Sequence, residues 1–550
     1  MNVSSKGPFA RWVEFAGYPV RTASAIAISF MIGLAYAILL LGPSVAFGAG
    51  DFWHLPRTWD QDTDIRISLS GYYWFVQDAW RWPLMHISGI NGPRGTNAAL
   101  FDVAPVLALA GKVIRSVTGT VVNLFPLWLT ATFALNAVAA AMLVRAMGLR
   151  TVLGTVVAAA MGAFAPVVHH RMVHLFLMQH WVFVFAMAYC IANMPRAPLR
   201  LRQALPMLGL CLLAVSMNLY LYVMTAAVAA AFFLQAAVQK SSRSPVAVAG
   251  LAAVPAIGAA LLWCFGVLAE TSTMAQTIPF GVNSMNLLAP FWPQASGAFQ
   301  WTGLYLLTRG SIGATRGQYE GYCYLGIGVL ILLAIALRAN VRRLPGIIRQ
   351  YWGMALALSV LTIWSVSNKV YLGGTLIAEY PVPDILLRTV LAWFRSSGRF
   401  FWPVMWMLLA LGIAGALRTR RPAAALVLAG LVLGLQWIDL SVWRGRVQAV
   451  TATAAPSMFG SAEAASEIEA MIARRGSVTA IPSFYCSAKG ADDYSSLVAR
   501  GAIEVQLMAA RMNVPMPGLS LARANPDCPA ERSTPLRDAV GTGVLVTLPD

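Results

Sequence analysis

Long apolar stretches alternate with short polar connections along most of this chain. Many of these stretches reach the roughly 18 residues that a helix needs to cross the hydrocarbon core of a bilayer. The first is longer than the apolar part of a cleavable signal peptide, so we expect it to persist as a helix. The pattern predicts eleven membrane-spanning helices, at about 23–44, 126–145, 151–168, 172–193, 203–217, 219–239, 246–268, 322–338, 350–367, 399–417 and 422–440.

Charged residues distinguish the two ends of these helices. Lys and Arg cluster in alternate connections, whereas the acidic residues, Glu14 excepted, fall in the others. Because Lys and Arg gather on the cytoplasmic side of membrane proteins, we expect the N-terminus inside and the C-terminus outside. The membrane part then spans 1–443, and a small extracytoplasmic α/β domain spans 444–550. Three long outer loops follow from this topology, at about 45–125, 269–321 and 368–398.

The composition supports a polytopic α-helical membrane protein. Hydrophobic residues make up 58% of the chain and charged residues 11%, with a mean hydropathy of +0.65, whereas soluble domains carry roughly 25% charged residues. The net charge is +18, but the basic residues lie in short clusters between apolar runs. This distribution favours contact with membrane lipids and excludes nucleic acid as a partner. We expect the protein in a bacterial inner membrane.

The C-terminal tail alternates helix-like and strand-like stretches. The helix-like ones are 461–476 and 496–513, and the strand-like ones are 476–484 and 543–550. Cys486 and Cys528 are the two cysteines of this tail, and an oxidising compartment would allow them to form a disulfide. The chain has no CxxC or CxxH spacing, so a structural zinc site is not expected.

The first outer loop is rich in carboxylates. Asp60, Asp62 and Asp64 alternate along the chain, and Asp102 follows in the second half of the loop. A carboxylate at a membrane surface can act as a general base toward a sugar hydroxyl, or can hold a divalent cation. A solvated acidic loop is the competing interpretation. The loop's second half, 101–119, is amphipathic and is expected to lie along the membrane interface.

Basic residues at the outer helix ends suggest a phosphate ligand. Arg171, Arg395 and Arg399 lie at or beside such ends, and a guanidinium binds phosphate through a bidentate fork. Arginines that merely reach lipid headgroups would show the same pattern. Four of the six histidines accompany Arg171 in "HHRMVHLFLMQHW". On a helix, His170 and His174 would share a face, whereas His180 would lie deeper and packed.

The order of several short motifs resembles a known family. These motifs are Asp64 with Gly71 seven residues later, "QDAWRWPL", "NGPRGTNAALFDVAP", "RMVHLFLMQHW", "YEGYCYLGIG" and "FRSSGRFFW". Together with the long acidic first outer loop, they make residues 20–440 similar to GT-C glycosyltransferases. These multipass enzymes use polyprenyl-phosphate-linked sugars. The chain is most similar to an uncharacterised group of bacterial multipass proteins placed near that superfamily.

The resemblance implies an inverting transfer from a polyprenyl-phosphate sugar to a glycan or lipid acceptor on the periplasmic side. It implies Asp64 as the general base, with Asp62 and Asp60 as fallbacks. The Asp-Glu pair of protein mannosyltransferases is absent because Ile65 follows Asp64, which argues against a protein acceptor. No cofactor is required, although a divalent cation on the three aspartates is compatible with the pattern. Candidates for sugar or acceptor binding are His174, Glu320, Asp102 and Tyr322.

Three other functions compete with this expectation. A transporter or flippase of lipid-linked glycans would need a polar path, but ionisable residues are nearly absent from the middle of the apolar stretches. A polysaccharide ligase or polymerase also has large outer loops and arginine-rich sites, and would use pyrophosphate carriers. A non-enzymatic scaffold would bind its partners through the tail.

Overall fold

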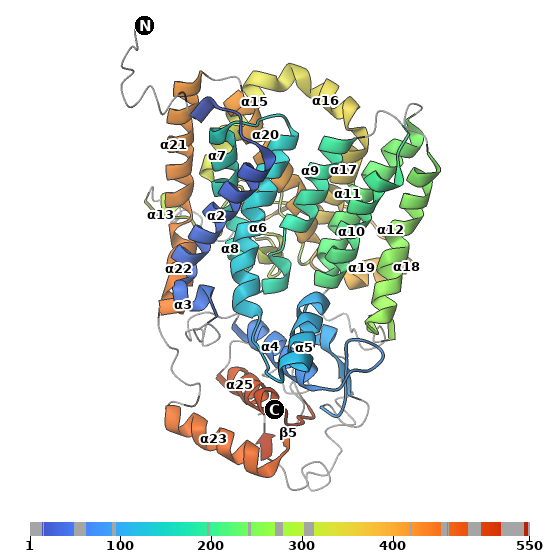
Figure 1. Cartoon of the computed structure of the whole chain (residues 1–550), viewed down its shortest axis with the longest axis vertical. Helices are drawn as coiled ribbons and strands as arrows, with labels where there is room; N and C mark the ends of the chain where they lie inside the picture. Colours follow the sequence, from blue (N-terminus) through green and yellow to red (C-terminus); the bar gives the residue numbers. More distant parts are fainter. Residues whose placement is uncertain are drawn as a thin grey trace.

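Helices dominate the structure and run roughly parallel along one axis (Figure 1). The computed structural model describes residues 14, 16–48, 62–90, 95–172, 174–194, 198–239, 244–269, 279–301, 313–418, 421–452, 459, 461–481, 497–518 and 544–547. The long helices are α2 (Thr22–Leu41), α6 (Phe125–Ala146), α7 (Val152–Ala163), α9 (Trp181–Asn193), α10 (Leu201–Met217), α11 (Leu219–Val238), α12 (Pro245–Cys264), α15 (Ile327–Asn340), α17 (Trp352–Val366), α20 (Trp402–Arg418) and α21 (Pro422–Asp439).

All eleven predicted helices overlap a described helix, so their existence is confirmed. By length and composition, eight helical stretches of the described residues are apolar enough to cross a membrane. Helices α10, α15 and α17 have 17, 14 and 15 residues and fall short of that length, so eleven spans stay a prediction. The chain has the architecture of a polytopic helical membrane protein.

Small residues allow the helices of the bundle to approach closely. A Cβ atom added to Gly33 on α2 would lie 2.5 Å from the carbonyl oxygen of Phe133 on α6. A Cβ at Gly162 on α7 would lie 2.7 Å from the Cβ of Ala140, also on α6. In a membrane, where lipid tails are as apolar as the helix surfaces, close backbone approach of this kind is a main source of helix association.

The stretch predicted as one helix over 172–193 is broken in the structure. Pro166 begins a short helix, α8 (Pro166–His170), which is followed by the 3₁₀ turn η2 (Leu175–Leu177) before α9 begins. His170 ends α8 and His174 lies beyond it, so the expectation that they share a helix face was wrong. The break turns Arg171 and His174 into loop residues at one end of the bundle.

Asn218 separates α10 from α11. Its backbone is extended, with φ −163° and ψ 142°, and its side-chain oxygen accepts a hydrogen bond of 2.9 Å from the Tyr220 amide. This side chain satisfies one of the amide groups that the first turn of α11 leaves without a helical partner. As a result, Tyr220 lies in the first turn of α11, where its ring faces the loops described below.

The first outer loop forms a helical layer across one end of the bundle. Its elements are α4 (Asp62–Gln77), the strands β1 (His86–Ile87) and β2 (Thr96–Asn97), the 3₁₀ turn η1 (Ala98–Phe101) and α5 (Pro105–Thr118). Figure 1 shows α4 and α5 below the ends of the long helices. The amphipathic stretch 101–119 contains α5, and its place along the membrane interface stays a prediction. The polar start of the loop is helical from Asp62 onward.

The remaining connections are short elements between the long helices. They are α3 (Pro43–Ala46), α13 (Gly297–Trp301), η4 (Gln318–Gly321), η5 (Val341–Arg343), α16 (Leu344–Gln350), the antiparallel strands β3 (Lys369–Leu372) and β4 (Thr375–Glu379), α18 (Asp384–Arg388), α19 (Val390–Trp393) and η6 (Ser397–Phe401). Two of them, η4 and η6, contribute charged residues to the cluster described next.

The C-terminal part contains the predicted helix and strand types. Its elements are α22 (Ser441–Ala452), α23 (Ala462–Arg475), β5 (Val478–Ile481), α25 (Leu497–Arg511) and β6 (Val544–Thr547), and β5 pairs with β6 in parallel. Figure 1 shows α23, β5 and α25 beneath α4 and α5, at the end of the molecule farthest from α16.

Candidate functional site

A buried carboxylate joins two arginines at the end of the bundle that α4 covers. One oxygen of Glu320, Oε2, accepts a hydrogen bond of 2.6 Å from Arg171 Nη1 and bonds of 3.0 and 2.7 Å from Arg399 Nε and Nη2. Arg171 Nη2 also donates to the Glu320 carbonyl at 2.6 Å. Three separate loops are thereby tied together by charge-assisted hydrogen bonds.

Two glycines allow these loops to meet. A Cβ atom on Gly398 would lie 2.4 Å from the Cα of Gly321, and a Cβ on Gly321 would lie 2.5 Å from the carbonyl oxygen of Ser284. Either contact would push the backbones apart. The amide of Gly398 also donates to the Asn283 carbonyl at 3.0 Å. The neighbours of these glycines, Glu320 and Arg399, are therefore held side by side by backbone packing.

Asp64 and His174 extend this cluster from the other side. His174 Nδ1 lies 3.5 Å from Asp64 Oδ2, and His174 Nε2 lies 3.9 Å from Glu320 Oε1. The imidazole thus stands between the two carboxylates. The exposed fraction falls from 38% for the Asp64 side chain to 16% for His174, 8% for Glu320 and 1% for Arg171. Asp64 is consequently the carboxylate that an incoming molecule reaches first.

Asp102 comes to the same place because α4 lies close against η1. A Cβ on Gly71 would lie 2.4 Å from the side chain of Phe101, the residue before Asp102. Asp102 has a left-handed backbone, with φ 58° and ψ 31°, which is uncommon for residues other than glycine and frequent at functional sites. The charge of its carboxylate acts on both Asp64 and Arg399.

The surroundings shift the pKa of Asp64 upward. Burial, the largest cause, and the charges of Asp102 and Glu320 raise this pKa to about 7, against the opposing effect of Arg395 and Arg399. The accessible 38% of the side chain admits solvent, which favours the ionised form and opposes the effect of burial. The carboxyl is therefore both perturbed and reachable, the combination that a general base requires.

Glu320 and His174 are held in single protonation states near neutral pH. Burial alone would raise the pKa of Glu320, but Arg171 and Arg399 outweigh it and hold the pKa well below its usual range. For His174, burial together with Arg399, Arg171 and Arg395 lowers the pKa to about 3, although Glu320 opposes this shift. Glu320 is thus a fixed anion, whereas His174 is a neutral donor and acceptor.

The three predicted phosphate ligands differ in how available they are. Arg171 is 1% exposed and its two Nη atoms are bonded to Glu320, so its expected role toward phosphate gives way to holding Glu320. Arg399 also binds Glu320, but its side chain keeps 10% exposure. Arg395 is partly exposed and has no ion-pair partner among the described residues. Arg395 and the free edge of Arg399 are the groups that suit an anionic ligand.

Tyr322 and three histidines pack against aromatic rings, although the charges of Arg171 and Glu320 act on His170. Tyr322 is 2% exposed and stacks on His170, with ring centroids 4.5 Å apart. His169 bonds Tyr36 Oη at 2.6 Å, and His180 is fully buried with its Nδ1 bonded to Trp406 Nε1 at 3.0 Å. These contacts are those of packed core residues. They give Tyr322 no described contact with the other predicted ligands, and His180 is packed as expected.

The structure describes the alternating aspartates only in part, so a divalent cation on them stays a prediction. Asp62 is the first residue of α4, the helix that also contains Asp64. Asp60 lies outside the described residues, as do Cys486 and Cys528 with their predicted disulfide. In the described part of the chain, no group of three or more His, Cys, Asp or Glu side chains is placed to hold a metal ion.

Tyr220 is a residue of the site that sequence analysis missed. Its hydroxyl oxygen accepts a 3.0 Å hydrogen bond from the Ser396 amide. Its ring lies under the Arg399 guanidinium, 4.8 Å from centroid to Cζ. Both contacts help to fix the backbone of the loop that holds Arg395 and Arg399. A tyrosine two residues after a capping asparagine was the available signal, but its partner is far away in sequence.

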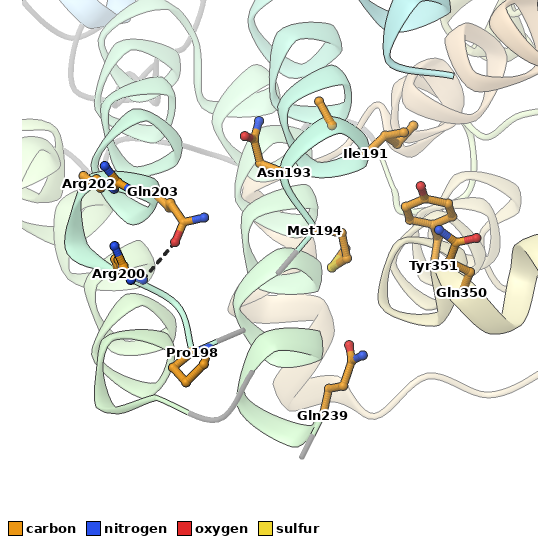
Figure 2. A pocket seen from close by; sticks show the side chains of 11 residues that line it. Ile191, Asn193, Met194, Pro198, Arg200, Arg202, Gln203, Gln239, Gln350 and Tyr351 are labelled. Carbon is orange, nitrogen blue, oxygen red and sulfur yellow. Dashed lines mark hydrogen bonds between the residues drawn. The ribbon is translucent and has the colours of Figure 1, made fainter. Parts of the chain in front are cut away.

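A pocket of about 670 Å³ lies elsewhere, between the ends of α9, α10 and α11 and the start of α17. Figure 2 shows Arg200, Gln203, Gln239 and Tyr351 around it. It contains none of the residues of the Asp64 cluster, which lie at the α4 end of the bundle. We therefore place the candidate site at the cluster of Asp64, Asp102, Arg171, His174, Glu320, Arg395 and Arg399.

The model of a protein family, described as a domain of unknown function, DUF6311, matches residues 30–441. The chain belongs to the DUF6311 family. The matched DUF6311 region contains every residue of the cluster and ends before α23 and α25. A search of curated proteins finds no match to this chain.

Proposed function

We propose that this DUF6311 protein is a membrane glycosyltransferase. In this proposal it moves a sugar from a polyprenyl-phosphate donor to a hydroxyl of a glycan or lipid acceptor, on the periplasmic side of the bacterial inner membrane. The observation that carries the proposal is the reachable Asp64, with its pKa raised to about 7, in one cluster with two partly accessible arginines. A base poised near neutral pH beside cations suits proton removal coupled to departure of a phosphate.

Asp64 acts as the general base in the proposed reaction. Its ionised carboxylate takes the proton of the acceptor hydroxyl while that oxygen attacks the anomeric carbon from the face opposite the phosphate. The new bond joins the acceptor oxygen to the anomeric carbon, and the bond from this carbon to the phosphate oxygen breaks. The electron pair of that bond leaves with polyprenyl phosphate, so the anomeric configuration inverts. No cofactor enters the balance.

Arg395 and Arg399 stabilise the leaving group. A phosphate monoester gains charge as the glycosidic bond breaks, and guanidinium groups that are already in place lower the cost of that charge. The Tyr220 ring under the Arg399 guanidinium and the contacts with Glu320 hold this arginine still, which avoids reorganisation during the reaction. The polyprenyl chain would extend from this site between the apolar helices.

His174 and Asp102 are assigned to the sugar or the acceptor. Neutral imidazole can both donate and accept a hydrogen bond, and the His174 ring lies between Asp64 and Glu320. Asp102, whose carboxylate acts on Asp64 and Arg399, accepts hydrogen bonds from sugar hydroxyls. Arg171 and Glu320 support the cluster from below without touching the substrate.

A transfer assay in vesicles tests the proposal. Membranes with the wild-type protein should release polyprenyl phosphate from a radiolabelled lipid-linked sugar and label an acceptor from the same membranes. Asp64→Asn should lose this activity by about 10²-fold or more, within the usual range of general-base effects. Asp384→Asn changes an exposed aspartate of another outer loop and should keep it. Full transfer by Asp64→Asn would overturn the assignment, and movement of the intact lipid-linked sugar across the bilayer would favour a flippase.

A further inference from the structure

Helix α4 has two buried faces rather than one. The face with Asp64 and Gly71 looks toward His174 and η1. A second stripe of side chains runs along α4 at helical spacing. It consists of Arg66, Ser70, Trp74 and Gln77. Positions 66 and 64 are about 200° apart around a helix, so the second stripe lies on the side of α4 that is turned away from the cluster.

The C-terminal helix α25 covers this second stripe. Arg66 Nη1 forms an ion pair with Glu504 Oε2, and the two side chains are only 3% and 8% exposed. Gln77 Nε2 donates to the Ala510 carbonyl at 2.8 Å, and Trp74 Nε1 donates to the Val514 carbonyl at 3.1 Å. These contacts run along α4 from its first turns to its end.

The second stripe needs this cover for a physical reason. Trp74 is fully buried and Arg66 is 2% exposed, although α4 carries Asp, Arg and Ser and is not among the candidate membrane spans. A buried guanidinium without a counter-charge is costly, and removing one partner of a buried pair is strongly destabilising. Glu504 supplies that counter-charge. The position of α4 therefore depends on a segment that lies outside residues 30–441, the matched family region.

We infer that α25 is a positioning element of the site, and that the Arg66–Glu504 pair sets where α4 presents Asp64. The effect on the rate of transfer rests on the proposed function, whereas the effect on the position of α4 does not. Asp64 has its raised pKa because this position is buried and lies near the carboxylates of Asp102 and Glu320. If α4 shifts, the carboxyl leaves that environment, its pKa falls toward the ordinary value, and the geometry for proton removal is lost.

Three full-length variants test the inference. Glu504→Gln removes the charge opposite Arg66, and the reversed pair Arg66→Glu/Glu504→Arg restores an ion pair at the same place. Glu467→Gln is the matched control, because Glu467 is exposed on α23. Glu504→Gln should lower transfer about 10–10²-fold, the scale of a 1 Å misplacement, and should move the inflection of the pH–rate profile to lower pH. The reversed pair should recover most of the rate, and Glu467→Gln should match the wild type.

Hydrogen exchange separates this inference from the proposed function. Amides of residues 66–77 should exchange faster in Glu504→Gln than in the wild type, whatever reaction the protein catalyses. If Asp64→Asn keeps full transfer while this exchange difference is present, the proposed reaction is wrong and the positioning role stands. An exchange rate and a pH inflection that both stay at the wild-type values in Glu504→Gln would overturn the positioning role. So would a reversed pair no more active than Glu504→Gln.

Discussion

The pKa of Asp64 leads to a quantitative prediction for the pH dependence of transfer. With a pKa of about 7, the ionised fraction of a carboxyl is about 91% at pH 8 and about 9% at pH 6. A rate that depends on this base should therefore fall about tenfold between these two pH values. A carboxyl with the ordinary pKa of about 3.9 would be ionised above 99% at both and would give a flat profile.

Two substitutions should move this profile in opposite directions. The carboxylate of Asp102 raises the pKa of Asp64 and the guanidinium of Arg395 lowers it. Asp102→Asn should thus shift the inflection to lower pH, and Arg395→Gln should shift it to higher pH. A downward shift of one full unit raises the ionised fraction at pH 6 from about 9% to about 50%, or about fivefold. Because both residues belong to the site, the comparison uses each variant's rate normalised to its own maximum.

The assay is the initial rate of polyprenyl phosphate release in vesicles buffered from pH 5.5 to 9. Asp384→Asn, whose carboxylate is exposed and is not among the charges that act on Asp64, should leave the inflection unchanged. A flat wild-type profile between pH 6 and 8 would refute the assignment of Asp64 as the titrating base. A shift of both variants in the same direction would refute the electrostatic reasoning.

Three further perturbations probe the charged cluster and its support. Glu320→Gln leaves the buried Arg171 without its counter-charge. It should lower the free energy of unfolding, measured by denaturant titration in detergent, by about 3–5 kcal/mol. An unchanged free energy of unfolding would contradict the pairing. Gly398→Ala places a Cβ 2.4 Å from the Gly321 Cα and should abolish transfer. Gly430→Ala adds a Cβ where no atom lies within 4 Å and should keep transfer. Equal activity of the two variants would argue against the close approach. Arg395→Ala should weaken inhibition by added polyprenyl phosphate about tenfold or more. Arg395→Lys should recover part of the inhibition, because lysine keeps the charge but lacks the bidentate fork of the guanidinium. An inhibition constant that neither change alters would exclude Arg395 as a phosphate ligand.

The apolar pattern predicted the helices well because each helix has to be apolar over its own length. All eleven predicted stretches contain a helix, including the pair on either side of Asn218. The main error was the prediction of one unbroken helix over 172–193. This stretch is largely apolar, and an apolar pattern does not indicate where a helix is interrupted. Helix α7 ends at Ala163, Pro166 begins the short helix α8, and η2 lies between α8 and α9. That break is what frees His174 to reach Asp64.

Residue type and topology together predicted many residues of the cluster, but they did not predict which side chains pair with each other. Asp64, Asp102, Glu320 and the arginines were each expected on the outer side, and the structure places them together. The sequence did not reveal that Arg171 is committed to Glu320, because the partners are 149 residues apart. Nor did it show that α25 packs on α4, since the Arg66–Glu504 separation of 438 residues leaves no local pattern to read.

The fate of the donor lipid tests the proposed function most directly. The purified protein is reconstituted with a polyprenyl-phosphate sugar labelled in both the sugar and the lipid, together with membrane extract as the acceptor. The proposal predicts free polyprenyl phosphate in equal amount to the sugar transferred, and neither product with Asp64→Asn. Recovery of the doubly labelled lipid intact on the opposite leaflet, or a requirement for a pyrophosphate-linked donor, would contradict it.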